Sequence, residues 1–263
     1  MLLAEPNHTP YDLHFTVLGF RVRVHPLFWL LGLFLGFNAH EPVVVLITTC
    51  VAFVSILIHE LGHSLMMRRF GRESHIVLYI MGGLAIEGTG SSFGGFRSRG
   101  SRSTYEQVLI SAAGPGAGFV LAGIVVAILY AMGGHIVEGR MADVIPFPMA
   151  QMGDNLADAG EKFRLMVLFD KLLLFNILWG VLNLFPVFPL DGGQIAQAVM
   201  IAKDPWGGLA RSLWLSVITG AIVAVVGGFV LQNLMMAMMF GSMAYSSYLA
   251  LQQIGGGGRG RPW

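Results

Sequence analysis

Two histidines and a glutamate with the spacing of a catalytic zinc motif lie near the end of a hydrophobic stretch. The sequence there is His59-Glu60-Leu61-Gly62-His63, which is a HExxH motif. Positions i and i+4 of a helix share a face, so His59 and His63 can offer two imidazoles to one zinc ion. Glu60, one position along, can then reach the water that the ion holds. This pattern indicates metal-assisted hydrolysis of a peptide bond.

The hydrophobic segment around the motif distinguishes it from a chance match. A HExxH string can also arise in a helix that buries two structural histidines. Here residues 43–58 are all apolar or small, and they are too few to cross a bilayer, because a spanning helix needs about 20 residues. The span must therefore include His59, Glu60 and His63. Ionisable groups at membrane depth are costly and usually mark function, so the context favours a functional site.

The composition is that of an integral membrane protein. The 263 residues are 55% hydrophobic and only 12% charged, whereas soluble domains are charged at about a quarter of their positions. The apolar stretches are continuous and lack the alternation of a membrane barrel, which favours helices. The single cysteine, Cys50, excludes an internal disulfide and a cysteine-rich metal site.

Six apolar stretches are predicted as membrane helices. They cover residues 26–39, 43–67, 107–132, 164–184, 214–230 and 231–251. The first opens with Pro26, which suits the first turn of a helix because its missing N–H costs nothing there. The third contains small residues at 112–118, which let another helix backbone approach closely. The pattern predicts an all-α membrane protein with about six transmembrane helices.

Two short segments are predicted as β-structure at the membrane edge. Hydrophobic residues alternate with arginines over residues 20–24, which is the period of a strand. Residues 75–87 are too few to cross the bilayer and are rich in β-branched types, with Gly82 and Gly83 at their centre, which predicts a hairpin. Residues 133–162 are predicted as a polar loop.

The basic residues outside the spans gather on one side of this map. That side holds Arg21, Arg23, Arg68, Arg69, Arg72, Arg97, Arg99, Arg102, Lys203, Arg211, Arg259 and Arg261, and the other holds Arg140, Lys162 and Arg164. The positive-inside rule then places both termini in the cytoplasm. The HExxH motif, close before Arg68, is expected nearer the cytoplasmic face.

A third zinc ligand is expected from the end of the fourth span. Catalytic zinc usually keeps three protein ligands and an open water position. Asp191 follows the fourth span on the side where the second span also ends, in a segment broken by Pro186, Pro189, Gly192 and Gly193. Irregular backbone at this depth is tolerated only where it is packed in protein or lines a cavity. An interfacial loop carboxylate is the alternative role for Asp191.

The other histidines show no spacing typical of metal ligands. They are scattered over both sides of the predicted map, at His8, His14, His25, His40, His75 and His135. We expect none of them to bind metal. Asp170 and Lys171, in the fourth span, are predicted to form a local neutralised pair.

The two motifs in this order resemble those of the site-2 protease family of intramembrane zinc metalloproteases. The resemblance rests on the HExxH motif within a span and on residues 183–193, which are similar to the family signature of an asparagine, two prolines and Asp-Gly-Gly. It is supported by His25-Pro26, Gly82-Gly83 and Ala113-Gly114-Pro115. The similarity covers about residues 13–200. Gly118 departs from the family, in which asparagine is frequent at this position.

The resemblance implies a role for each matching residue. His59, His63 and Asp191 would bind one zinc ion per chain, and Glu60 would be the catalytic base. Asn183 would hold the substrate backbone or the developing oxyanion. The implied activity is a zinc metalloendopeptidase that hydrolyses peptide bonds within or near transmembrane segments, in regulated intramembrane proteolysis.

The same resemblance sets the expected organisation and surroundings. Residues 1–263 would form one integral membrane protease domain, with a catalytic core at about 13–200, extra helices at about 209–251 and a flexible tail at 252–263. The distribution of basic residues and the compactness of the chain, rather than the resemblance, give a prokaryotic cytoplasmic membrane as the expected location. The expected partners are a transmembrane protein substrate and membrane lipid, without nucleic acid, and the oligomeric state stays open.

A helical substrate must unwind before hydrolysis, because its carbonyls are held in its own hydrogen bonds. We therefore expect Gly82, Gly83 and Leu84 of the hairpin to bind the unwound segment by strand addition. The main alternative function is a catalytically silent scaffold that binds membrane helices. Two other functions are less favoured. A diiron membrane desaturase needs more clustered histidines than this chain has, and a glutamate directly after a metal-binding histidine suits hydrolysis better than metal transport.

Overall fold

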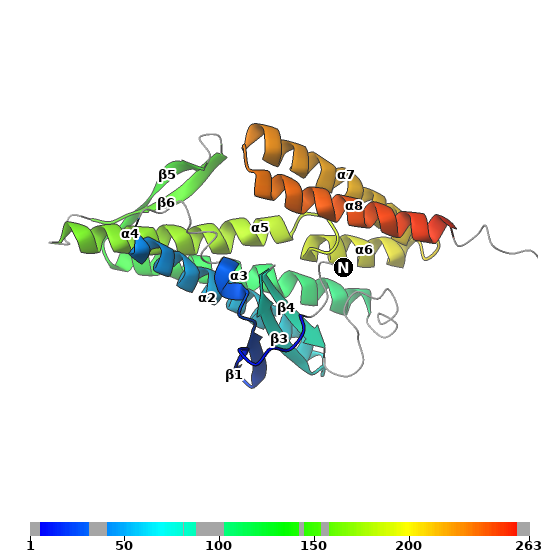
Figure 1. Cartoon of the computed structure of the whole chain (residues 1–263), viewed down its shortest axis with the longest axis horizontal. Coiled ribbons are helices and arrows are strands. Elements are labelled where there is room, and N and C mark those ends of the chain that lie inside the picture. The colour runs from blue at the N-terminus through cyan, green and yellow to red at the C-terminus, as the bar shows by residue number, and fades with distance from the viewer. Residues whose placement is uncertain are drawn as a thin grey trace, which may run out of the picture. The chain divides into compact units, whose positions relative to one another are not determined.

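The computed structural model describes residues 6–31, 41–80, 82–87, 103–141, 145–153 and 158–256 (Figure 1). The described chain is mostly helical and has two small sheets. It divides into two compact units. Unit 1 comprises Met1–Arg102 and Ala113–Gly180, and unit 2 comprises Ser103–Ala112 and Val181–Trp263. One long helix, α3 (Thr104–Ala131), contributes residues to both units.

A four-stranded sheet in unit 1 has the order β1-β2-β3-β4 (Figure 1). Its strands are β1 (Leu13–Val17), β2 (Phe20–Val24), β3 (Ser74–Tyr79) and β4 (Gly82–Glu87). The outer pairs are antiparallel, whereas β2 and β3 are parallel, with Val22 opposite Ile76. Parallel neighbours need a long crossover, and helix α2 (Pro42–Arg69) lies between these strands in the chain. The predicted hairpin is confirmed as β3 and β4, but Gly82 and Gly83, expected at its centre, are the first two residues of β4.

The sheet packs its apolar residues against the helix that carries the HExxH motif. Phe20, Val22 and Val24 of β2 are buried with Ile56 and Leu61 of α2. The predicted alternation along this strand is therefore confirmed for its hydrophobic positions. The sheet is thus held against α2 by an apolar core that includes residues on either side of the motif histidine His59.

The two arginines of β2 differ in burial. Arg21 is exposed, as expected, but Arg23 is buried and forms an ion pair with Asp12, with 3.1 Å between Nη1 and Oδ2. Burial acts to raise the pKa of Asp12, but hydrogen bonds from Thr9 and Arg23 and the Arg23 charge outweigh it. The pKa is lowered to about 2. A sequence pattern does not show this partner because it comes from the turn before β1.

Helix α2 begins and ends as its sequence predicts. Pro42 lies in its first turn, and Arg68 and Arg69 lie in its last turn, where positive charge suits the helix dipole. The chain leaves the helix through Gly71, which has a positive φ of 72°. The remaining helical run of unit 1 is α4 (Ala159–Leu173), a π-helical turn η1 (Leu174–Leu178) and the start of α5 (Trp179–Asn183).

The predicted polar loop at 133–162 is wrong. It contains a hairpin of β5 (His135–Met141) and β6 (Ile145–Gln151), which lies beside α4 in Figure 1, and α4 itself already begins at Ala159. Ala150 and Met152 pack against Phe169 of α4. The Ala150 N–H also donates to Asp170 Oδ1 at 2.6 Å, which gives this carboxylate a partner in addition to the predicted Lys171. Tertiary packing therefore orders a segment that its polarity assigned to a loop.

Unit 2 is built from three helices that follow the second motif. They are α6 (Asp191–Lys203), α7 (Gly208–Val225), which continues into a π-helical turn η2 (Val226–Val230), and α8 (Leu234–Gly256). Helices α7 and α8 lie side by side, and a Cβ at Gly220 of α7 would lie 3.2 Å from the Phe240 carbonyl oxygen of α8. Small residues thus allow this close helix pair.

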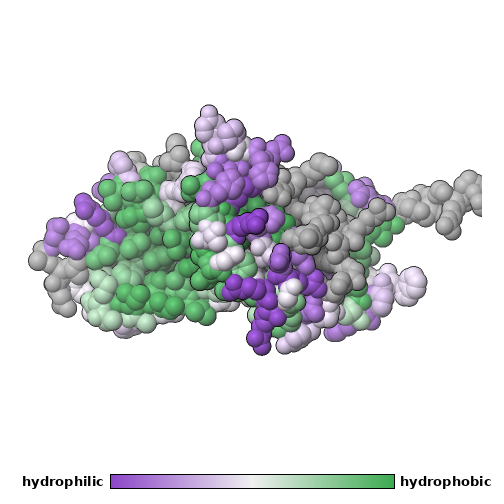
Figure 2. Space-filling view, turned by 90° about the horizontal axis from the view of Figure 1, so that it is seen from below, coloured by the Kyte–Doolittle hydropathy of each residue, from purple (hydrophilic) through white to green (hydrophobic). Residues whose placement is uncertain are grey.

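Within the described residues, five helices are long and apolar enough to cross a membrane. They are Pro42–Arg69, Thr104–Ala131, Ala159–Asn183, Gly208–Val230 and Leu234–Ile254. They match the second to sixth predicted spans, and the chain is an integral membrane protein. Figure 2 shows hydrophobic residues gathered over a broad area of the viewed face, as lipid contact requires. Most of the first predicted span, 26–39, lies outside the described residues, as do 88–102 and 257–263.

Replacing Arg23 by Met should destabilise the protein, because Asp12 would keep its buried position with fewer hydrogen bonds. We expect a loss of about 1–3 kcal/mol and a lower Tm in detergent at neutral pH. Because the pKa of Asp12 falls from its ordinary value of 3.8 to about 2, the contribution is present above pH 3.8 and lost as pH falls toward 2. Arg21→Met, at an exposed position of the same strand, should change little; equal losses in both variants would contradict the assignment.

Candidate metal centre

The two histidines of the HExxH motif lie side by side on α2, within unit 1. Both are buried, at 5% and 7% exposure, and their Nε2 atoms are 3.1 Å apart. Their rings meet edge to face, with 4.8 Å between centroids. Two imidazoles on one tetrahedral zinc, at Zn–N distances of about 2.0–2.1 Å, place their nitrogens about 3.3 Å apart. The geometry of His59 and His63 therefore fits two ligands of one zinc ion.

Glycines at the contact between α2 and α3 make room for this pair. A Cβ at Gly114 of α3 would collide with Nε2 of His63 and would lie 2.8 Å from Nε2 of His59. A Cβ at Gly62 of α2 would collide with the carbonyl oxygen of Ala113. The predicted close approach of a helix to the small residues of the third span is therefore confirmed, and it occurs at the face that carries the two histidines.

The glutamate of the motif, Glu60, lies against the edge strand β4 of the sheet. It is 6% exposed, and a Cβ at Gly83 of β4 would collide with its side chain and would lie 2.7 Å from Oε1. Burial, and then the negative charge of Glu60, raise the pKa of Tyr79 to about 12. The predicted substrate-binding residues Gly82, Gly83 and Leu84 thus lie on a strand whose backbone borders the Glu60 carboxylate.

A buried asparagine that sequence reasoning missed supports the same helix. Asn176, in η1, is 3% exposed, and its Nδ2 donates to Ser55 Oγ at 2.9 Å and to the Leu172 carbonyl at 2.8 Å. Ser55 lies one turn before His59 on the same face of α2. A Cβ at Gly118 of α3 would lie 3.6 Å from Asn176 Oδ1. The glycine that departs from the family pattern thus borders an asparagine supplied by another helix.

Asn176 lies within the π-helical turn η1. Helices η1 and α5 form one apolar span with α4, and π-helical turns inside such helices occur frequently at functional sites. The sequence did offer one signal for Asn176. It is an amide within an apolar span, and a buried polar side chain at membrane depth needs a partner.

Asp191 and Asn183 belong to unit 2. Asp191 is 6% exposed and is the first residue of α6, where a carboxylate is favoured by the helix dipole. Asn183 is the last residue of α5 and is half-buried. The irregular segment between them contains a cis Phe188–Pro189 bond, and the Phe188 N–H donates to Ser216 Oγ at 3.0 Å. The predicted break between two helices is confirmed.

The two glycines after Asp191 do not break the helix, and that part of the prediction is wrong. Gly192 and Gly193 lie in the first turn of α6. A Cβ at Gly192 would collide with the Leu184 carbonyl, and one at Gly193 with the backbone of Val187. These glycines therefore allow the irregular segment to fold back onto α6. The break in the helix is caused by Pro186 and Pro189.

Comparison with known proteins decides the family. The model of peptidase family M50 matches residues 47–225, which is more than half of the chain. The chain belongs to peptidase family M50. This agrees with the resemblance to site-2 proteases that the two motifs indicate.

Two relatives extend the comparison. Zinc metalloprotease MJ0392 of Methanocaldococcus jannaschii is 28% identical over 195 residues, which are 74% of this chain and 43% of that protein. The chain thus spans less than half the length of this relative. The solved structure of the Site-2 Protease from Methanocaldococcus jannaschii matches with a TM-score of 0.53 and 20% identity, over 92% of this chain and 95% of that one. This M50 chain therefore shares the site-2 protease fold, and the family implies zinc.

Replacing Gly114 by Ala should disturb the histidine pair, because the new methyl group would occupy the space of both Nε2 atoms. We expect the zinc content of purified protein to fall well below that of the wild type, measured by mass spectrometry of the metal. Gly116→Ala is the matched control on the same helix, since a Cβ there meets nothing within 4 Å. Full zinc content in the Gly114 variant would show that the close contact does not shape the pair.

Proposed function

We propose that this chain is an intramembrane zinc metalloprotease that hydrolyses peptide bonds within or near transmembrane segments of membrane proteins. In this proposal His59, His63 and Asp191 hold one zinc ion. The observation that carries the proposal is the buried pair of imidazoles, with 3.1 Å between Nε2 atoms, on a helix of membrane-spanning length. Membership of family M50 supports it.

The donor set suits zinc. Two neutral imidazoles and one carboxylate are a known ligand set of catalytic zinc, which keeps a fourth position for water or substrate. Asp191 is buried at the start of a helix in a membrane protein, where an ionised carboxylate is expensive unless a cation or hydrogen-bond donors compensate it. A zinc ion would provide that compensation.

The side chains of this chain would carry the proton and the developing charge. Zinc, when bound, supplies a Lewis acid that polarises the scissile carbonyl and lowers the pKa of a water molecule. The Glu60 carboxylate accepts the proton of that water and later passes it to the leaving amine. The contact with Gly83 holds this carboxylate in one place. The amide of Asn183 donates to the oxyanion as the carbonyl carbon becomes tetrahedral.

A groove beside the motif supports a transmembrane helix as substrate. It has a volume of about 550 Å³ and lies between α2 and α3 in unit 1. Its lining is apolar or small and includes Ile58, Met66, Gly116, Ala117, Val120 and Ile124. Small side chains let a helix backbone come close, as in helix packing within membranes. Ile58 precedes His59 in the chain, so a helix in this groove would pass beside the metal-binding residues.

The edge strand β4 supports strand addition as the way to hold the unwound substrate. Hydrogen-bonded and non-hydrogen-bonded pairs alternate in an antiparallel ladder, and the pair that closes a two-residue hairpin is hydrogen-bonded. Tyr79 and Gly82 are that closing pair. Gly82 and Leu84 therefore direct their backbone groups toward β3, whereas Gly83 and Ala85 direct theirs toward the open edge of the described sheet.

Replacing Glu60 by Gln should abolish cleavage and keep the metal, because the amide cannot accept the proton. We expect a fall of at least about 100-fold in the cleavage rate of a labelled single-span membrane polypeptide, with unchanged zinc content. Glu73→Gln, an exposed glutamate just after α2, is the control and should cleave as the wild type does. Wild-type protein that holds zinc and cuts no membrane polypeptide would instead support the silent scaffold, and an active Glu60 variant would contradict the mechanism.

Replacing Ala85 by Pro should slow cleavage without loss of zinc, because it removes an N–H that points to the open edge and leaves the β3–β4 ladder intact. Ala85→Val, which keeps the N–H, is the matched control. The expected measurement is a raised KM or lower kcat/KM for the proline variant alone. Equal cleavage by both variants would rule out strand addition at this edge.

A further inference from the structure

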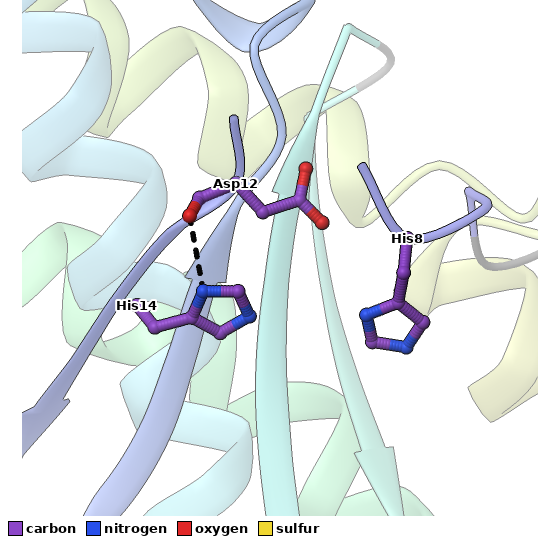
Figure 3. Close-up of side chains that lie close together, drawn as sticks. All are labelled: His8, Asp12 and His14. Carbon is purple, nitrogen blue, oxygen red and sulfur yellow. Dashed lines mark hydrogen bonds between the residues drawn. The ribbon is translucent and has the colours of Figure 1, made fainter. Parts of the chain in front are cut away.

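We propose that His8, Asp12 and His14 form a second binding site for a divalent transition metal such as Zn2+, apart from the HExxH pair. The sequence gives no hint of this site, because the three residues have no familiar spacing and lie among scattered histidines. The fold brings them together: one ligand atom of each lies within 4.8 Å of the others. Figure 3 shows the two imidazole rings on either side of the Asp12 carboxylate.

The tautomer of one histidine is fixed by the backbone. His14 Nδ1 lies 3.0 Å from the carbonyl oxygen of Asp12, shown as the dashed line in Figure 3. A carbonyl oxygen only accepts hydrogen bonds, so Nδ1 carries the hydrogen and Nε2 keeps its lone pair for a metal. A backbone carbonyl in this position is a common outer partner of metal-binding histidines, because it orients the ring.

The carboxylate between the rings is held in place and ionised. Asp12 Oδ1 accepts from the Thr9 hydroxyl at 2.6 Å, and Oδ2 accepts from the Thr9 N–H and from Arg23 Nη1. Ligating carboxylates are normally hydrogen-bonded in this way, and each oxygen has a second lone pair. Three contacts over two oxygens thus leave room for one more partner.

Access to the site is provided by the histidines. The Asp12 side chain is 0% exposed, whereas His8 and His14 are exposed, so rotation of their rings opens a path to the carboxylate. The two imidazoles favour zinc, copper or nickel, and together with one carboxylate they leave a coordination position for water. The positive charge of Arg23 beside the carboxylate opposes a cation, so this site should bind more weakly than the HExxH site.

A metal here would act on stability rather than on catalysis. It would link His8, in the segment before the sheet, to His14 of the edge strand β1. The sheet carries β4, the strand against Glu60, at its opposite edge. An ion that binds only the folded state stabilises it in proportion to its concentration above Kd. The inference does not depend on the proposed function, because it concerns other residues.

The test is a zinc titration of the full chain in detergent after removal of metal with a chelator. Calorimetry and metal analysis after desalting should show two binding events in the wild type, a tight one and a weaker one. His8→Ala/His14→Ala should lose the weaker event, with an affinity reduced by at least about tenfold, and should keep cleavage activity. His135→Ala, an exposed histidine on β5, is the control and should keep both events.

The Tm without metal shows whether the double variant is folded. It should equal the Tm of the metal-free wild type, because the two histidines are expected to stabilise the fold only when zinc is bound. Addition of zinc beyond the first equivalent should raise the Tm of the wild type and of His135→Ala but not of the double variant. A wild type with one binding event only, or a double variant that keeps the weaker event, would overturn the proposal.

Discussion

The contact between α2 and α3 is the constraint on which the arrangement of the histidine pair depends. Gly62 and Gly114 bring the two helix backbones so close that a methyl group at either position would collide with its neighbour. At Gly114 the neighbour is the histidine pair itself. A membrane helix has no hydrophobic driving force toward another helix, so van der Waals contact between small residues and hydrogen bonds between buried polar groups must provide the attraction. The bond between Asn176 and Ser55 adds such a link from a third helix.

The sheet complements this contact from the other side of the motif. Because β2 and β3 are parallel, the chain must pass through α2 between them, and the sheet is thereby joined to the motif helix by a shared apolar core. Its edge strand then borders Glu60 through Gly83. One helix thus presents the histidines toward α3 and the glutamate toward β4.

Much of this arrangement could be predicted from the sequence, and the exceptions have physical causes. The spans and the β3–β4 hairpin follow from hydropathy and from β-branched residues, which act locally. The β5–β6 hairpin did not follow, because its order comes from packing on α4. Asn176 was missed because a single amide in an apolar span forms no motif with other residues at a recognisable spacing.

Two further differences arise from contacts between segments distant in the chain. Gly192 was assigned to a helix break, whereas its lack of a side chain serves a close backbone contact with Leu184. Arg23 alternates with hydrophobic residues in the sequence, yet it is buried, because the turn before β1 supplies its partner, Asp12. Local sequence patterns indicate the periodicity and polarity of an element, but they do not indicate which distant segment packs against it.

The central claim is that one zinc ion is bound by residues of both motifs. It is tested most directly by a zinc-edge anomalous difference map from crystals of the purified protein. The account predicts a peak at about 2.0–2.2 Å from Nε2 of His59, Nε2 of His63 and a carboxylate oxygen of Asp191. A peak that lacks Asp191 among its neighbours, or the absence of a peak at the histidine pair in protein that contains zinc, would contradict it.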